Sequence, residues 1–141
     1  MEPIDVSRLP AGALILMDSA PIIYVLEGHP RYSDRFEPIF DLQASGDIRF
    51  AVTTMTIAEV LTGPLAAGEE TLARRYRSVL ESWQVIDMDS SIAESAARMR
   101  ALFRLKLADA VQVASAIAIN ADALVTHDRD FSRVRGLNVI S

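Results

Sequence analysis

The 141-residue sequence contains no cysteine and only two histidines, His29 and His127. The absence of cysteine excludes disulfides, thiolate metal sites and a cysteine nucleophile, and it permits residence in the cytoplasm. Two histidines alone cannot build a zinc site. Any metal centre in this chain must therefore depend on oxygen ligands.

Long hydrophobic runs are also missing. No stretch approaches the roughly 20 apolar residues of a membrane span, and the start MEPIDVSR has no basic region before an apolar core, as a secretory signal would. We therefore expect a cytoplasmic protein without a membrane partner. Half of the residues are hydrophobic, which suits one domain over residues 1–141 with a core large enough to fold alone.

Positive charge is scarce, since 14 basic residues stand against 19 acidic ones and the net charge is -5. A general basic surface for a polyanion is disfavoured, so a nucleic-acid partner would require a local basic patch or metal ions. Lys106 is the only lysine, and the other basic residues are arginines. Arginine suits bidentate phosphate contacts, although a genome-wide codon bias explains the same composition.

Strand-like and helix-like patterns alternate along the whole chain. Short apolar or β-branched runs predict strands at 13–17, 48–53, 84–88, 123–126 and 137–140. Helical spacing and helix signals predict helices at 19–27, 34–44, 56–63, 68–83, 90–105 and 110–119. This order predicts an α/β sandwich with a central, mainly parallel sheet flanked by helices. In such sheets the functional crevice lies beyond the carboxyl ends of the strands.

Carboxylates occupy the positions that this crevice would use. Asp18 follows the first predicted strand, Glu59 lies a short turn past the second, and Asp128 follows the fourth. Asp109 opens the helix before the fourth strand, so a helix running one way and a strand running back would bring it near Asp128. Asp130 stands two residues further on.

Each acid also has an ordinary structural explanation. Asp18 and Asp109 suit helix N-caps, and the segment Thr56–Glu59 fits a capping box. Asp128 and Asp130 suit turns. Carboxylates that converge on one rim, however, repel each other and need a counter-charge, so we expect them to form a site.

A cluster of oxygen ligands selects Mg²⁺ or Mn²⁺ over zinc or copper. Such ions support phosphodiester hydrolysis without a side-chain nucleophile, because they activate water and stabilise the leaving oxygen. They also supply the positive field that an acidic protein lacks. Ser19 and Thr126 stand beside the acids and could orient a water at the metal, or serve as a helix cap and as strand-end packing.

Four segments together resemble the PIN-domain family, specifically the VapC-like toxins of bacterial toxin-antitoxin pairs. They are LMDSAPIIYVLEGHPRY, TIAEVLTGP, LADAVQVASAIA and ALVTHDRDF, in the family's order and approximate spacing over nearly the full length. The resemblance implies a PIN-like three-layer sandwich and a Mg²⁺- or Mn²⁺-dependent endoribonuclease. It also implies inhibition by a cognate antitoxin and a homodimer.

The resemblance carries individual residues as well. It implies that Asp18, Glu59, Asp109 and Asp128 are the catalytic, metal-binding acids, with Asp130 as an alternate or outer fourth acid. Ser19 stands where the family often has threonine, which keeps the hydroxyl.

A basic patch precedes Asp109 and is our candidate RNA-binding surface. It comprises Arg98, Arg100, Arg104 and Lys106, and helical spacing places Arg100 and Arg104 on one face. A solvated face of an amphipathic helix explains the same residues. Two other functions remain open: a non-catalytic PIN-like module that binds RNA or protein, and a phosphoacceptor receiver domain. The second is disfavoured, because Lys106 precedes a helix instead of following a strand.

Overall fold

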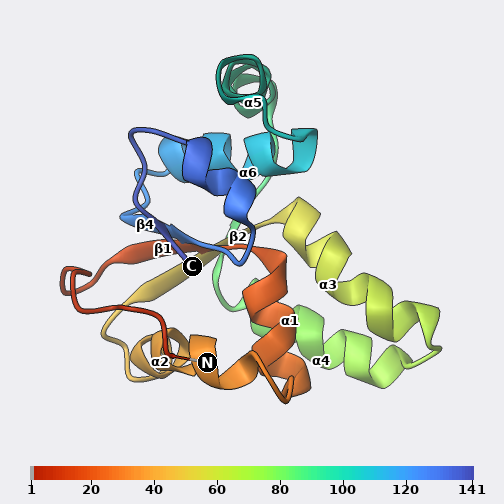
Figure 1. The fold of residues 1–141 in the computed structure, drawn as a ribbon. Coiled ribbons are helices and arrows are strands. Elements are labelled where there is room, and N and C mark those ends of the chain that lie inside the picture. Colours follow the sequence, from red (N-terminus) through yellow and green to blue (C-terminus); the bar gives the residue numbers. More distant parts are fainter. Residues whose placement is uncertain (1) are drawn as a thin grey trace.

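A computed structural model describes residues 2–141 as a single five-stranded sheet with helices on both faces (Figure 1). Met1, the first residue of the predicted domain, lies outside the described residues. The strands are β1 (Leu14–Met17), β2 (Arg49–Thr53), β3 (Gln84–Ile86), β4 (Ala123–Val125) and β5 (Val139–Ile140). They lie in the order β3-β2-β1-β4-β5, and every neighbouring pair is parallel. The predicted α/β class and parallel sheet are confirmed.

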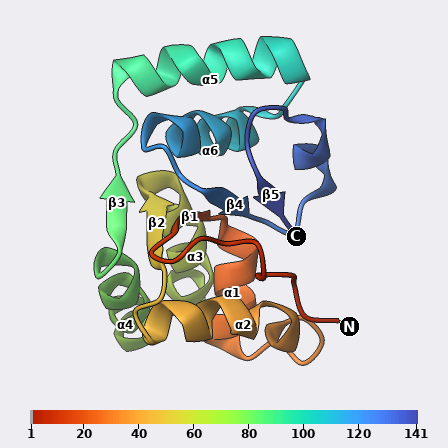
Figure 2. The same cartoon turned by 90° about the vertical axis from the view of Figure 1, so that its left-hand side faces the viewer.

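Helices cover the sheet in two groups. They are α1 (Ser19–Glu27), α2 (Ser33–Ala44), α3 (Thr54–Ala66), α4 (Glu70–Glu81), α5 (Ser90–Phe103), α6 (Leu107–Ala118) and the short 3₁₀ helix η1 (Arg129–Arg133). In Figure 2, α5 and α6 lie on one side of the sheet and α1 to α4 on the other. This arrangement is the predicted three-layer sandwich. Within residues 2–141, no helix is both long and apolar enough to cross a membrane.

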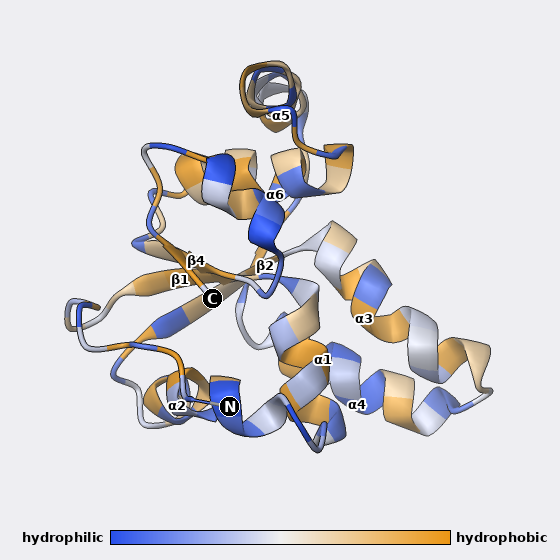
Figure 3. Ribbon diagram, viewed as in Figure 1, coloured by the Kyte–Doolittle hydropathy of each residue, from blue (hydrophilic) through white to orange (hydrophobic). Residues whose placement is uncertain are grey.

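Each face of the sheet has its own hydrophobic core because side chains alternate along a strand. In β1, Ile15 and Met17 pack against α1 and α2, whereas Leu14 and Leu16 pack against α5 and α6. A strand that is buried on both faces reads as a continuous apolar run. Strands β1 and β4 are accordingly coloured as hydrophobic in Figure 3.

Helix α3 differs from the prediction at both ends. It begins at Thr54, and it continues through Gly63 and Pro64, where we predicted its end. Pro64 is buried in the last turn. A proline has no backbone N–H and removes one helical hydrogen bond, but no further turn follows that it could disrupt. The chain leaves the helix at Gly68, whose φ of 73° favours glycine.

The segment after β4 also differs, since the predicted polar loop contains η1. Phe131 is fully buried at the centre of η1 and packs into the core under α5 and α6. One buried aromatic side chain thus anchors a segment that is otherwise hydrophilic.

Candidate active site

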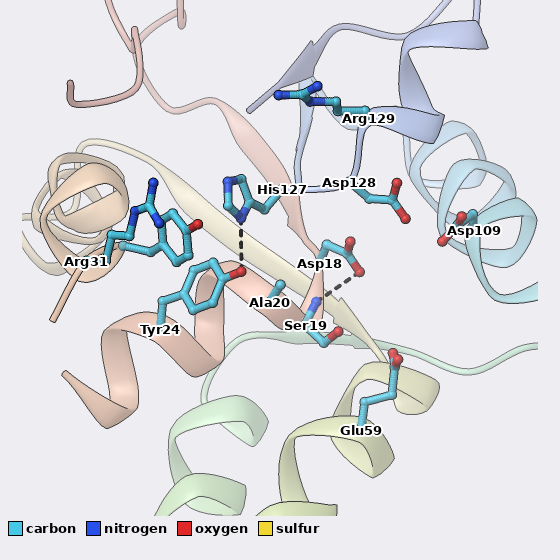
Figure 4. Close-up of a pocket in the computed structure, with 11 residues that line it drawn as sticks. Asp18, Ser19, Ala20, Tyr24, Arg31, Glu59, Asp109, His127, Asp128 and Arg129 are labelled. Atoms are coloured by element: carbon cyan, nitrogen blue, oxygen red, sulfur yellow. Dashed lines mark hydrogen bonds between the residues drawn. The ribbon is translucent and has the colours of Figure 1, made fainter. Parts of the chain in front are cut away.

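A pocket of about 730 Å³ opens at the carboxyl ends of β1 and β4, beside the start of α3 and α6 (Figure 4). The sheet order changes direction here, because β2 lies on one side of β1 and β4 on the other, and open α/β sheets bind ligands at such switch points. Eleven residues line the pocket: Asp18, Ser19, Ala20, Tyr24, Arg31, Tyr32, Glu59, Asp109, His127, Asp128 and Arg129. The four predicted acids therefore share one pocket.

Asp18 is held in place by donors from three parts of the chain. Its Oδ1 accepts from Ser19 N at 2.9 Å and from Gln112 Nε2 at 3.0 Å, and its Oδ2 accepts from Thr126 Oγ1 at 2.8 Å. The bond to Ser19 N means that Asp18 does cap α1, as its structural explanation required. The same carboxylate faces the pocket, so the two roles coexist.

Gln112 is a site residue that sequence reasoning missed. It is 1% exposed in the middle of α6, and its Nε2 also donates to Thr56 Oγ1 at 2.8 Å, while its Oε1 accepts from Thr53 Oγ1 at 3.1 Å. A glutamine inside an apolar buried run must find partners, and that signal was present in AVQVASA. Gln112 thereby joins α6 to the ends of β1 and β2.

Asp109 is the most perturbed acid in the pocket. It lies in the first turn of α6, and Lys106 occupies the N-cap position, so the capping explanation for Asp109 was wrong. Burial, followed by the charges of Asp128, Asp18 and Asp130, raises its pKa to about 6 from an ordinary 3.8, against a smaller opposing effect of Lys106. Its Oδ2 is buried and has no hydrogen-bond partner among residues 2–141.

Asp128 and Asp130 complete a group of three carboxylates with Asp109. Carboxylate oxygens of the three residues all lie within 4.8 Å of one another. Asp128 lines the pocket, and its Oδ1 accepts from Asp130 N at 2.9 Å, so it also caps η1. Asp130 does not line the pocket, and its Oδ1 lies 3.6 Å from Arg133 Nη2. The predicted proximity of Asp109 and Asp128 is confirmed.

Glu59 approaches the pocket from α3, and its capping-box explanation was wrong. The N-cap of α3 is Thr53, which accepts from Thr56 N at 3.1 Å, so Thr56 already lies inside the helix and Glu59 is a turn further along. Partial burial and then the charge of Asp18 raise the pKa of Glu59, and a hydrogen bond with Ser19 opposes this. The Glu59 carboxylate is therefore not used to cap α3, and it lines the pocket.

These features fit a hard divalent cation. Asp18, Glu59, Asp109 and Asp128 contribute four carboxylates to the pocket, and carboxylates are ligands that Mg²⁺ and Mn²⁺ prefer. Within the described chain, no salt bridge neutralises Asp18, Glu59, Asp109 or Asp128. A buried carboxylate oxygen without a partner, repelled by its neighbours, is stabilised when a cation joins the group.

The predicted RNA-binding residues lie elsewhere. Arg100, Arg104 and Lys106 are exposed and do not line this pocket. Helix α5 ends at Phe103, and Arg104 adopts φ 55° just beyond it, so Arg100 and Arg104 do not share a helical face as expected. Their role in RNA binding remains a prediction.

His127 also lines the pocket. Its Nδ1 lies 2.9 Å from the Tyr24 hydroxyl oxygen. Burial, followed by the charges of Arg35 and Arg129, lowers its pKa.

The family model that matches the chain is the PIN domain, over residues 15–137. A search of curated proteins finds no significant match. Among solved structures, a toxin-antitoxin complex from Klebsiella pneumoniae has 23% identity and a TM-score of 0.73, with 90% of this chain and 96% of that chain covered. VapBC2 from Rickettsia felis, bound to a DNA fragment from its promoter, has 20% identity and a TM-score of 0.72, with 89% of this chain and 96% of that chain covered. VapC20 from Mycobacterium tuberculosis is described as a toxin that cleaves the sarcin-ricin loop. It has 15% identity and a TM-score of 0.68, with 84% of this chain and 92% of that chain covered.

Proposed function

The chain belongs to the PIN domain family, and we propose that it is a Mg²⁺- or Mn²⁺-dependent endoribonuclease acting as the toxin of a toxin-antitoxin pair. One observation carries the proposal: Asp109 lines a pocket together with Asp18, Glu59 and Asp128, and its Oδ2 is buried without a hydrogen-bond partner among residues 2–141. The neighbours in fold, which include a toxin-antitoxin complex and a toxin described as cleaving the sarcin-ricin loop, support the same class.

Asp18, Glu59, Asp109 and Asp128, which line the pocket, would hold the metal, with Asp130 as the alternate fourth acid beside Asp109 and Asp128. When bound, the metal supplies positive charge that activates water and stabilises the leaving oxygen of a phosphodiester. The donors Gln112 and Thr126 hold the Asp18 carboxylate in its orientation.

Asp109 must give up a proton for this role. Because its pKa is raised to about 6, metal binding competes with protonation, and metal affinity falls as the pH decreases below that value.

Thr126 contacts both Asp18 and the loop that carries Asp128. Its Oγ1 donates to Asp18 and accepts from Asp128 N at 3.0 Å. One hydroxyl therefore fixes the backbone of the loop that carries Asp128 relative to Asp18. Ser19 stands between Asp18 and Glu59, where its hydroxyl can orient a water.

We further propose that the protein acts in the cytoplasm as a homodimer and that an antitoxin inhibits it. A guanidinium matches carboxylates bidentately, so an arginine of the antitoxin placed near Asp18 and Asp109 would block the metal-binding group. Apolar antitoxin residues would pack nearby on α1 and α3. On α3, Leu65 is 46% exposed and accessible to such a partner.

The test is cleavage of RNA by the purified protein in Mn²⁺ and in EDTA. Wild type should cut only with metal, and Asp109→Asn should lower the rate by roughly 100-fold or more. Asp41→Asn, which changes an exposed acid on α2, is the matched control and should cut like wild type. If the folded Asp109→Asn variant cleaves at the wild-type rate, the proposal is wrong. If wild type binds RNA in Mn²⁺ without cutting it, the protein is the non-catalytic module.

A further inference from the structure

The pocket has a second end, away from the carboxylates, which we call the aromatic end. In Figure 4, Arg31, Tyr24 and His127 lie on one side of the pocket, opposite Asp109 and Glu59. The aromatic end consists of the lining residues Tyr24, Arg31, Tyr32, His127 and Arg129. Holding a metal ion does not require these rings or arginines, so this part of the pocket needs a different explanation.

The rings of the aromatic end are fixed before any ligand arrives. Tyr32 lies edge-on to His127, with centroids 4.7 Å apart at 63°, and it stacks on His29 at 4.9 Å and 23°. The Tyr24 hydroxyl and His127 Nδ1 form a hydrogen bond of 2.9 Å. His29 Nδ1 accepts from the backbone N–H groups of Arg31 and Tyr32, both at 3.1 Å, which holds the loop between α1 and α2. A preorganised site of this kind loses little side-chain entropy when a planar group binds.

Two free positive charges flank the rings. Arg31 and Arg129 are exposed, and neither makes an ion pair with any residue from 2 to 141. The Arg31 guanidinium carbon lies 5.4 Å from the centre of the Tyr32 ring. In a protein of net charge -5, these two side chains form a local patch that suits phosphate.

The connection between the two ends is short, because His127 and Asp128 are consecutive residues of the loop after β4. A polymer whose phosphodiester lies at the carboxylates would therefore place its neighbouring group at the aromatic end. Aromatic platforms flanked by arginines are the chemistry that recognises single-stranded nucleic acid, whose unpaired bases can stack and whose phosphates meet the arginines.

We propose that the aromatic end binds one unpaired nucleotide of the RNA, next to the bond held at the carboxylates. The base packs against Tyr32 and His127, and the flanking phosphates contact Arg31 and Arg129. The proposal rests on the proposed function for its substrate class. It adds a position for one base and a requirement that this base be unpaired.

The experiment measures binding without metal, so that it does not depend on catalysis. Fluorescein-labelled octauridine is titrated with protein in EDTA at low salt, and anisotropy is compared with that of an abasic octamer of equal phosphate charge. Wild type should bind octauridine roughly tenfold tighter than the abasic octamer. Tyr32→Leu should abolish this difference, and Tyr32→Phe should keep it. Arg31→Ala should weaken both octamers alike, whereas Arg75→Ala, on the exposed face of α4, should change neither.

Photo-crosslinking keeps the test decisive if Tyr32→Leu does not fold. An octamer with 4-thiouridine should crosslink wild type within the peptides that carry Tyr32 or His127. Equal binding of octauridine and abasic octamer by wild type, no binding of either, or crosslinks confined to α5 would overturn the proposal. Base-dependent binding without Mn²⁺-dependent cleavage would leave this proposal standing and refute the nuclease.

Discussion

Neutralising Asp109 should stabilise the metal-free protein at neutral pH, which is the opposite of what removing a structural carboxylate does. The variant Asp109→Asn replaces the carboxylate with a neutral amide of nearly the same shape. In wild type, the ionised carboxylate is partly buried, faces Asp128, Asp18 and Asp130, and has one oxygen without a hydrogen-bond partner. Ionising Asp109 is therefore more costly in the folded chain than in the unfolded one.

The sign and size of the effect follow from the pKa. The folded state holds the Asp109 proton up to about pH 6, whereas the ordinary value is 3.8, so wild type loses stability as the pH rises through this window. The interval corresponds to about 3 kcal/mol. Because the side chain is only partly buried and water screens it, we expect roughly half of that. Asp109→Asn should match wild type only at about pH 3, below the ordinary pKa of 3.8. It should exceed wild type by about 1.5 kcal/mol at pH 7, or roughly 3–6 °C in Tm.

Thermal melting in EDTA from about pH 3 to pH 7.5 covers the whole window and measures the difference, with Asp41→Asn as an exposed control that should follow wild type. Adding Mn²⁺ at a hundredfold excess over its Kd should then stabilise wild type by about 2.7 kcal/mol and the variant far less, which reverses their order. A variant that is less stable than wild type in EDTA at pH 7, or an equal Mn²⁺ shift in both proteins, would refute the reasoning.

Two further predictions concern the rest of the site. Asp128→Asn should slow Mn²⁺-dependent cleavage more than Asp130→Asn, because Asp128 lines the pocket whereas Asp130 lies 3.6 Å from Arg133. Initial cleavage rates at saturating Mn²⁺ measure this difference. The reverse ranking would make Asp130 the fourth acid. Gln112→Leu should destabilise the protein by roughly 1–3 kcal/mol, because it removes a donor to Asp18 and the amide partners of the buried Thr53 and Thr56 hydroxyls. Urea unfolding measures this, and an unchanged midpoint would contradict it.

The sequence by itself determined the alternation of strands and helices and the edge of the sheet where the acids meet. Both follow from short-range properties: apolar periodicity defines each element, and parallel strands all end at the same edge. Asp18 and Asp128 could therefore be placed together although 110 residues separate them in the chain. The capping explanations for Glu59 and Asp109 failed for a local reason, since the N-cap positions of their helices are Thr53 and Lys106.

Only the tertiary structure decided which side chains support the acids and what lies beside them. Gln112 binds Asp18 across 94 residues, and Tyr24 binds His127 across 103; periodicity within a helix contains no information about such partners. The orphaned oxygen of Asp109 likewise depends on how deeply α6 packs against the sheet. Buried polar groups must find partners wherever the fold places them, so long-range packing decides which groups are satisfied and which are left for a ligand.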